Sequence, residues 1–152
     1  MDTLKSEFLF EMRIETAAAV STGATAGGER RFVGVTGGRF EGPRLKGEIL
    51  GCGSDALWTQ PGGRTLLDVL AVLRTDDGAA IYVQYRGVRN GPAAVLRRLA
   101  DGQQVDPEEY YFRTVILFET GDPRYEWLND LVAVGIGHRP PSGPVYRVFA
   151  VL

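Results

Sequence analysis

Three charged side chains interrupt apolar stretches of the sequence that have the pattern of β-strands. Asp68 lies within the segment 66–73, and Arg113 and Glu119 lie within the segment 111–119. Because residues two apart share one face of a strand, each of these charges shares its face with Leu or Val side chains. An isolated charge in apolar surroundings is costly, so each must find a partner, water or a ligand. We therefore predict that all three point into the interior of the fold.

These side chains are suited to proton transfer on a bound organic molecule. Asp68 and Glu119 are candidate general acids or bases, and Tyr82 is a candidate proton donor. Arg113 would orient a carboxylate or an enolate in the same site. The alternative is that Asp68, Arg113 and Glu119 form internal ion pairs or bind backbone amides, because structural networks also bury charges. Catalysis requires that they converge on an open cavity, whereas the structural role requires that they pair with no room left.

Residues beside turns form a second set of candidates. Asp55 follows the small residues of the segment 51–54, which permit close approach of a ligand, although a turn aspartate also commonly bonds its own backbone. Trp58 and Trp127 flank turns, where indole rings can rim the mouth of a barrel; the alternative for any single ring is the core. We predict that Asp55, Trp58, Trp127 and Arg113 contact the ligand.

The sequence offers few residues for metal or nucleotide chemistry. Cys52 is the only cysteine and His138 the only histidine, so disulfides within the chain, cysteine zinc sites and sites with several histidines are excluded. Neither a G-x-x-x-x-G-K-[ST] phosphate loop nor a G-x-G-x-x-G turn that opens a helix occurs. We therefore expect no metal and no cofactor, and we expect the Cys52 thiol to be inert.

Charge and hydropathy restrict the partners and the location. The formal net charge is −2 and the pI is about 5.5, which gives no basic surface for nucleic acid. The segment 1–7 carries acids where a secretory signal would carry bases. The longest apolar stretches, such as 69–73, fall far below the roughly 20 residues of a membrane helix. We expect a cytoplasmic protein without nucleic-acid or membrane partners.

Strand patterns recur along the chain with turn residues between them, as in all-β sandwiches and barrels. The tripeptide 76–78 is a tight hairpin signal, because Asp-Gly accepts positive φ angles. The segment 92–100 has a helical stripe that begins with Pro92 and ends before Gly102. Together these patterns predict a single domain, residues 1–152, that is an antiparallel β-barrel of about ten strands with one short helix across one end. The predicted loops are 23–28 and 140–144, and the predicted strands are 8–15, 31–36, 39–41, 44–50, 56–60, 66–75, 79–88, 110–120, 131–137 and 145–151.

Glycines alternate with large side chains in the segment 37–48, as they do where a barrel wall bends. We predict that Gly42 and Gly47 lie where the strand bends or where another strand passes close. Together with Phe-Glu-Thr at 118–120 and Tyr-Glu-Trp-Leu-Asn at 125–129, this segment makes the chain resemble the DUF3237 (UPF0311) family of small β-barrel proteins.

The resemblance to DUF3237 extends over nearly the whole chain. It implies a calycin-like β-barrel with an internal cavity, and often self-association, but it establishes no catalytic residues. Arg39 and Asn129, which lie in the segments on which the resemblance rests, complete the predicted ligand-binding residues.

The leading functional hypothesis is a β-barrel that binds a small molecule in its lumen. Its enzymatic form is a cofactor-independent isomerase, cyclase or hydratase that acts on an apolar or aromatic metabolite. The alternative is a non-catalytic binding or interaction protein, in which an exposed apolar strand face forms a homodimer. Apolar residues cluster on both faces of the segment 66–73, which favours self-association.

Overall fold

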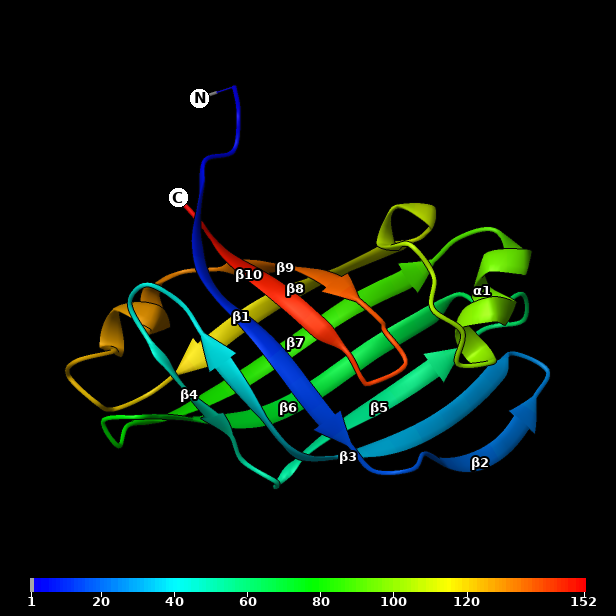
Figure 1. Ribbon diagram of the computed structural model, residues 1–152, viewed down its shortest axis with the longest axis horizontal. Coiled ribbons are helices and arrows are strands. Elements are labelled where there is room, and N and C mark those ends of the chain that lie inside the picture. The colour runs from blue at the N-terminus through cyan, green and yellow to red at the C-terminus, as the bar shows by residue number, and fades with distance from the viewer. Residues whose placement is uncertain (1) are drawn as a thin grey trace.

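The computed structural model describes residues 2–152, so Met1 of the predicted domain lies outside the described residues (Figure 1). Strands make up most of this part of the chain, with one α-helix and two short 3-10 helices between them. The elements in order are β1 (Ser6–Thr16), β2 (Val20–Thr25), β3 (Gly28–Glu41), β4 (Lys46–Ile49), β5 (Gly53–Thr59), β6 (Thr65–Thr75), β7 (Ala80–Asn90), α1 (Ala93–Ala100), η1 (Pro107–Glu109), β8 (Tyr111–Glu119), η2 (Glu126–Asp130), β9 (Ala133–His138) and β10 (Val145–Val151).

The strands close into an antiparallel barrel. β1 pairs with β10, and the order continues through β9, β8, β7, β6 and β5 to β3, which pairs with β1 again. β4 takes the place of β5 between β3 and β6 at the end of the barrel far from α1 (Figure 1), and β2 pairs with β3 outside the closed ring. The fold class predicted from the sequence is confirmed.

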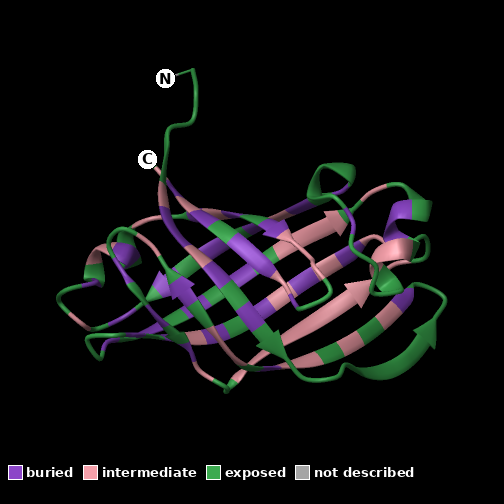
Figure 2. Ribbon diagram, viewed as in Figure 1, coloured by how far each residue is buried: buried purple, intermediate pink, exposed green. Residues whose placement is uncertain are grey.

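The barrel wall separates buried from exposed side chains residue by residue. Along β6, β7 and β8 the two classes alternate, which gives the banded strands of Figure 2. This is the pattern of strands with one face on a core and the other toward water.

Aromatic rings fill one end of the lumen and only border the other. Phe10 packs edge-on against Phe40 and Phe118, with ring centroids 5.4 and 6.1 Å apart, at the end near β4. Toward α1, the ring centroid of Tyr146 lies 5.3 Å from that of Phe112 and 5.2 Å from that of Tyr85. These three rings line a cavity. The barrel is therefore solid at one end and hollow at the other.

Helix α1 covers the hollow end. It begins after Pro92, whose fixed φ suits a helix start, and it is followed by Gly102 with φ +75°, a conformation that favours glycine. Ala93, Leu96 and Arg97 line the cavity. The predicted helix and its position across one end of the barrel agree with the structure.

The glycine and hairpin predictions are confirmed. Gly78 has φ +96°, and the Gly78 N–H donates to the Thr75 carbonyl at 2.9 Å, which closes the turn between β6 and β7. A Cβ atom at Gly42 would overlap the carbonyl of Leu9, and one at Gly47 would overlap the carbonyl of Arg74. At both glycines another strand passes too close for any side chain.

Two predicted boundaries differ from the structure. The glycine-rich segment predicted as a loop at 23–28 belongs largely to β2 and β3, which form a hairpin with a short turn between them. β3 is also one continuous strand, where the sequence predicted two strands at 31–36 and 39–41. Gly38 adopts φ +141° against the backbone of Arg13, so the wall bends there without ending the strand.

Candidate functional site

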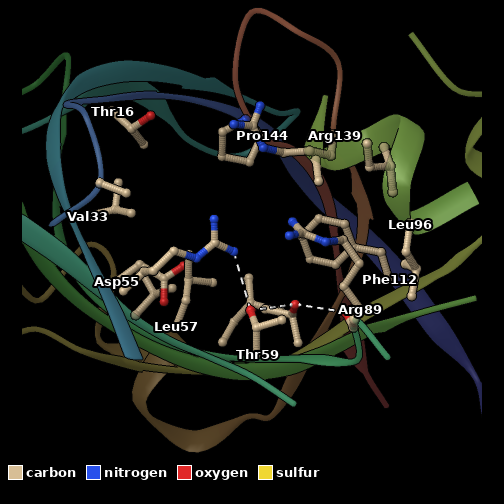
Figure 3. A pocket seen from close by; sticks show the side chains of 18 of the residues that line it. Thr16, Val33, Asp55, Leu57, Thr59, Arg89, Leu96, Phe112, Arg139 and Pro144 are labelled. Atoms are coloured by element: carbon tan, nitrogen blue, oxygen red, sulfur yellow. Dashed lines mark hydrogen bonds between the residues drawn. The ribbon is translucent and has the colours of Figure 1, made fainter. Parts of the chain in front are cut away.

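The hollow end of the barrel contains a cavity of about 610 Å³ (Figure 3). Its walls are mostly apolar, with side chains such as Leu57, Leu67 and Phe112, and α1 contributes Leu96 at the end. Five charged side chains interrupt this lining: Arg31, Asp55, Arg89, Arg97 and Arg139. A cavity of this size with few polar groups has the character of a small-molecule site, for which roughly 300–1,000 Å³ is usual.

Asp55 is the only carboxylate in the lining of this cavity, within the described residues. It shares the inner face of β5 with Leu57 and Thr59, and its carboxylate accepts a hydrogen bond of 3.1 Å from the backbone N–H of Asp68 on β6. Burial raises the pKa of Asp55 to about 6, although the Asp68 N–H and the charges of Arg89 and Arg31 oppose the shift. Such a carboxyl group can both release and accept a proton near neutral pH.

Arg89 on β7 presents a half-buried guanidinium to the same cavity. Its guanidinium carbon lies 5.5 Å from the centroid of the Phe112 ring, but no group of residues 2–152 accepts a hydrogen bond or forms an ion pair with it. Burial lowers the pKa of Arg89, and the nearby charges of Arg139 and Arg31 add to that effect. A desolvated cation without an anionic partner is unfavourable, so this position favours an anion in the cavity.

Arg31 and Arg139 donate hydrogen bonds to neutral groups. Arg31 Nη2 donates to Thr59 Oγ1 at 3.3 Å, and Arg139 Nη1 donates to the Pro140 carbonyl at 2.8 Å. The Arg139 backbone N–H also donates to the Tyr110 hydroxyl at 2.8 Å. Together with Arg89 and with Arg97 of α1, four arginines line the cavity beside one carboxyl group, so its lining has an excess of positive charge.

Two tyrosines add hydroxyl groups at the wall. Tyr85 on β7 and Tyr146 on β10 are both fully buried, and their rings pack edge-on with centroids 5.2 Å apart. Burial raises the pKa of both phenols, so both keep their protons at neutral pH. They can act as hydrogen-bond donors and not as bases.

The prediction that Asp68, Arg113 and Glu119 point into the barrel is wrong. Asp68 faces outward and pairs with Arg86 at 3.4 Å. Arg113 lies on the outer side of β8, where Nη1 donates to the Phe112 carbonyl at 2.9 Å, and Glu119 is exposed on the same side. Both faces of these strands are apolar enough to be buried, so alternation identified the two faces without identifying the inner one. We do not propose these residues for chemistry in the lumen.

The other predicted residues, apart from Asp55, also lie away from the cavity. Tyr82 is on the outer face of β7 beside Glu119. Trp58 is on the outer side of β5, where Arg30 stacks over its ring at 5.1 Å. Arg39 lies 3.7 Å from Asp76 at the surface.

The two predicted residues of the segment 125–129 support local structure at the solid end of the barrel. The Trp127 indole N–H donates to the Arg124 carbonyl at 3.2 Å, and Arg44 stacks over the ring at 3.6 Å. Asn129 bridges the backbone of Thr120, accepting from its N–H at 2.8 Å and donating to its carbonyl at 2.9 Å. These hydrogen bonds hold together the loop that follows β8.

The sequence analysis did not identify the cavity residues Arg31, Arg89, Arg139 and Tyr146. Arg31 shares one face of β3 with Val33 and Val35. A charged residue on an apolar strand face is the same pattern that singled out Asp68. Arg89 was lost because the predicted strand ended at 88, whereas β7 continues to Asn90.

Comparison with known proteins places the chain in a family. The family model described as "Protein of unknown function (DUF3237)" matches residues 4–151. The chain belongs to this family. Among curated DUF3237 relatives, a UPF0311 protein of Rhodopseudomonas palustris is 36% identical over 150 residues, which are 99% of this chain and 98% of the relative. The family resemblance inferred from the sequence is confirmed.

Solved structures confirm the barrel of the DUF3237 chain. A crystal structure of a protein of unknown function from R. palustris superposes with a TM-score of 0.96 at 36% identity, covering 100% of both chains. A β-barrel-like protein from Acinetobacter baumannii has a TM-score of 0.87 at 38% identity, covering 100% of this chain and 98% of that one. A structure described as an enzyme from Penicillium herquei has a TM-score of 0.73 at 21% identity, covering 98% and 95%, which shows the fold alone.

The described residues, 2–152, offer neither a metal site nor a membrane-spanning helix. His, Cys, Asp and Glu side chains do not gather in groups of three or more that could hold a metal ion. No helix in this range has the length and apolar character needed to cross a membrane.

Proposed function

We propose that this DUF3237 protein binds a small organic anion with an apolar or aromatic body in its lumen and catalyses a cofactor-free proton transfer on it. Isomerisation, cyclisation and hydration are reactions of this kind. The observation that supports the proposal best is the relation between Asp55 and Arg89. Their charges act on each other within one buried cavity, yet they form no ion pair. Both side chains line the same cavity, so a ligand held in it can interact with both.

The roles of the two residues follow from their charges. Arg89, with Arg31 and Arg139 nearby, would stabilise a carboxylate, or the enolate that forms when a proton leaves an adjacent carbon. Asp55, with its pKa at about 6, would remove that proton and return it elsewhere on the molecule. Tyr146, whose raised pKa keeps it protonated, would donate a hydrogen bond to a developing oxyanion.

Binding is tested with 2-naphthoate and its neutral analogue 2-naphthamide, followed by isothermal titration calorimetry. Naphthoate should bind the wild-type protein, and naphthamide should bind at least about tenfold more weakly, because it offers no charge to the arginines. Arg89→Leu should abolish this preference without loss of thermal stability, since it removes a buried charge that has no partner. The matched control is Arg86→Leu on the outer face of the same strand, which should bind as wild type does. Equal affinity for the anion and the amide would contradict the proposal.

Catalysis is tested with phenylpyruvate, an aromatic anion that has an exchangeable C–H beside its carbonyl. The wild-type protein should accelerate exchange of this hydrogen with D₂O, measured by proton NMR, over the rate in buffer. Asp55→Asn should bind phenylpyruvate but lose the acceleration, and Asp68→Asn should keep it. Binding without exchange in the wild-type protein would favour the non-catalytic alternative.

That alternative, a binding or interaction protein, is the second candidate. The apolar outer wall of the barrel favours it, because exposed apolar surface of this extent is unusual for a protein that acts alone. A fungal protein described as an enzyme has the same fold, so the fold accommodates catalysis, but a shared fold does not assign an activity.

A further inference from the structure

The outer wall of the barrel between β6 and β9 is apolar where a wall that faces water is usually polar. Six exposed, large hydrophobic side chains lie on it, drawn from four adjacent strands: Leu70, Tyr82, Tyr111, Val115, Leu117 and Ile136. Val115 and Leu117 at its centre are 55% and 50% exposed. By contrast, the outer side of β1 is charged, with Glu11 beside Arg13. We call the surface formed by these six residues the β8 face.

We propose that the β8 face docks against the β8 face of a second copy of the chain, with β8 running antiparallel to its counterpart. The two-fold axis would lie in the plane of the interface and pass across β8 near Ile116. An isologous contact of this kind requires a surface that is complementary to itself. The charges and the shape of the β8 face both meet this requirement.

The charges on the β8 face are arranged symmetrically about its centre. Arg113 and Glu119 lie on the same side of β8, three residues before and three residues after Ile116. Antiparallel docking therefore brings Arg113 of one copy opposite Glu119 of the other, twice in the dimer. It also brings Val115 of one copy opposite Leu117 of the other. The interface then has an apolar centre with an opposite-charge pair on each side.

The relief of the β8 face has the same symmetry. The half around Arg113 contains a hollow. Its lining includes Trp58 of β5, Val88 of β7 and Tyr111 of β8. The other half presents Tyr82, which pairs in register with Glu119. The antiparallel arrangement places Tyr82 of one copy over the hollow beside Val88 of the other. A projection and a hollow on one molecule thus meet their complements on the second.

The size of the surface is sufficient for a dimer. Strands lie about 4.8 Å apart and rise about 3.4 Å per residue, so the outer faces of β6 to β9, taken along the 9 residues of β8, cover roughly 600 Å² in projection. Stable interfaces bury roughly 600–1,000 Å² per partner, so the β8 face reaches the lower end of this range. The contact leaves α1 and the end of the lumen that it covers outside the interface.

The oligomeric state tests the proposal. Sedimentation velocity of the wild-type protein should give a dimer, with twice the chain mass of 16.6 kDa. Leu117→Glu should give a monomer, because it places two like charges together at the centre of the interface. The control is Val20→Glu, an exposed apolar residue of β2 outside the β8 face, which should remain dimeric. A monomeric wild-type protein, or a dimer that survives Leu117→Glu, would overturn the proposal.

Charge exchange tests the antiparallel arrangement. Arg113→Glu and Glu119→Arg should each weaken dimerisation about tenfold or more, since each places like charges opposite one another. The double variant Arg113→Glu/Glu119→Arg should restore the wild-type dissociation constant to within about threefold. Circular dichroism melts should show that all three variants fold, because both side chains face outward. If the single reversals have no effect, or the double variant is not restored, the antiparallel arrangement is wrong.

Discussion

Asp55 and Asp68 are joined by a hydrogen bond, yet they lie on opposite sides of one barrel wall. The Asp68 backbone N–H donates to the Asp55 carboxylate, so the two residues are direct neighbours on β5 and β6. The Asp55 side chain faces the cavity, where burial raises its pKa to about 6. The Asp68 side chain faces water and pairs with Arg86. The same residue type thus has a perturbed proton affinity on the inner wall and an ordinary ion pair on the outer wall.

Arg89 and Arg86 repeat the contrast on β7. Arg89 is half-buried beside Phe112 without an anionic partner, whereas Arg86 is exposed and pairs with Asp68 at 3.4 Å. Electrostatic interactions are strong on the inner wall, because low polarity surrounds the charges, and are screened on the outer wall. The inner wall is therefore suited to ligand chemistry, and the outer wall to association.

The largest difference between the walls should appear in packing. Ile116→Ala empties a fully buried position on the inner face of β8 and should cost about 4 kcal/mol of unfolding free energy. Leu117→Ala, the next residue on the outer face, should cost about 0.5 kcal/mol or less at protein concentrations where the chain is monomeric. Urea unfolding measures both. Similar losses would mean that the β8 face is packed within the monomer.

The second difference concerns charge. The pKa of Asp55 is about 6 in the folded protein and about 3.9 in an unfolded chain, so its ionisation favours unfolding. Wild-type stability should therefore lose up to about 3 kcal/mol from this group as the pH rises from about 4 to 6. Asp55→Asn should remove that loss and be the more stable protein at pH 8, with little difference at pH 3.

The matched variant Asp68→Asn controls for the charge effect. It removes a partly exposed ion pair on the outer wall and should change stability by less than about 1 kcal/mol at either pH. Thermal melts of the three proteins at several pH values separate the cases. An Asp55→Asn protein that is less stable than wild type at pH 8 would show that Asp55 is needed to compensate the arginines.

A third, smaller difference lies on β4. Gly47 faces inward against the carbonyl of Arg74, so Gly47→Val should displace the wall and cost about 2 kcal/mol. Glu48→Gln on the outer face should have almost no effect. The melting temperatures of Gly47→Val and Glu48→Gln, each compared with that of the wild-type protein, measure the two effects. Equal changes would show that the close approach of β4 and β6 can relax.

The smallest effect is expected at a turn that belongs to neither wall. Gly78 has φ +96° and open space where a Cβ would lie, so Gly78→Val acts through backbone strain alone. The loss should be about 1 kcal/mol in denaturant unfolding. No measurable loss would mean that the turn between β6 and β7 adopts another conformation without cost.

The sequence was informative wherever structure depends on neighbours along the chain. Alternation identified most strands, Asp-Gly identified the turn at Gly78, and Pro92 with Gly102 bounded the helix. Gly42 and Gly47 were recognised because glycine in a β-rich segment indicates a bend or the close approach of another strand. These features depend on local geometry, so a local pattern specifies them.

Only the tertiary structure decided which face of each strand lies inside. A period of two is symmetric, so where both faces are apolar, as in β6 and β8, it cannot distinguish the lumen from the outer wall. Asp68 and Arg113 were therefore predicted inside and lie outside, and Arg31 and Arg89 were overlooked and line the cavity. Ring closure between β1 and β3 fixes the inner side for every strand at once. The residues of the site come from strands far apart in the sequence, and only the closed barrel brings them together.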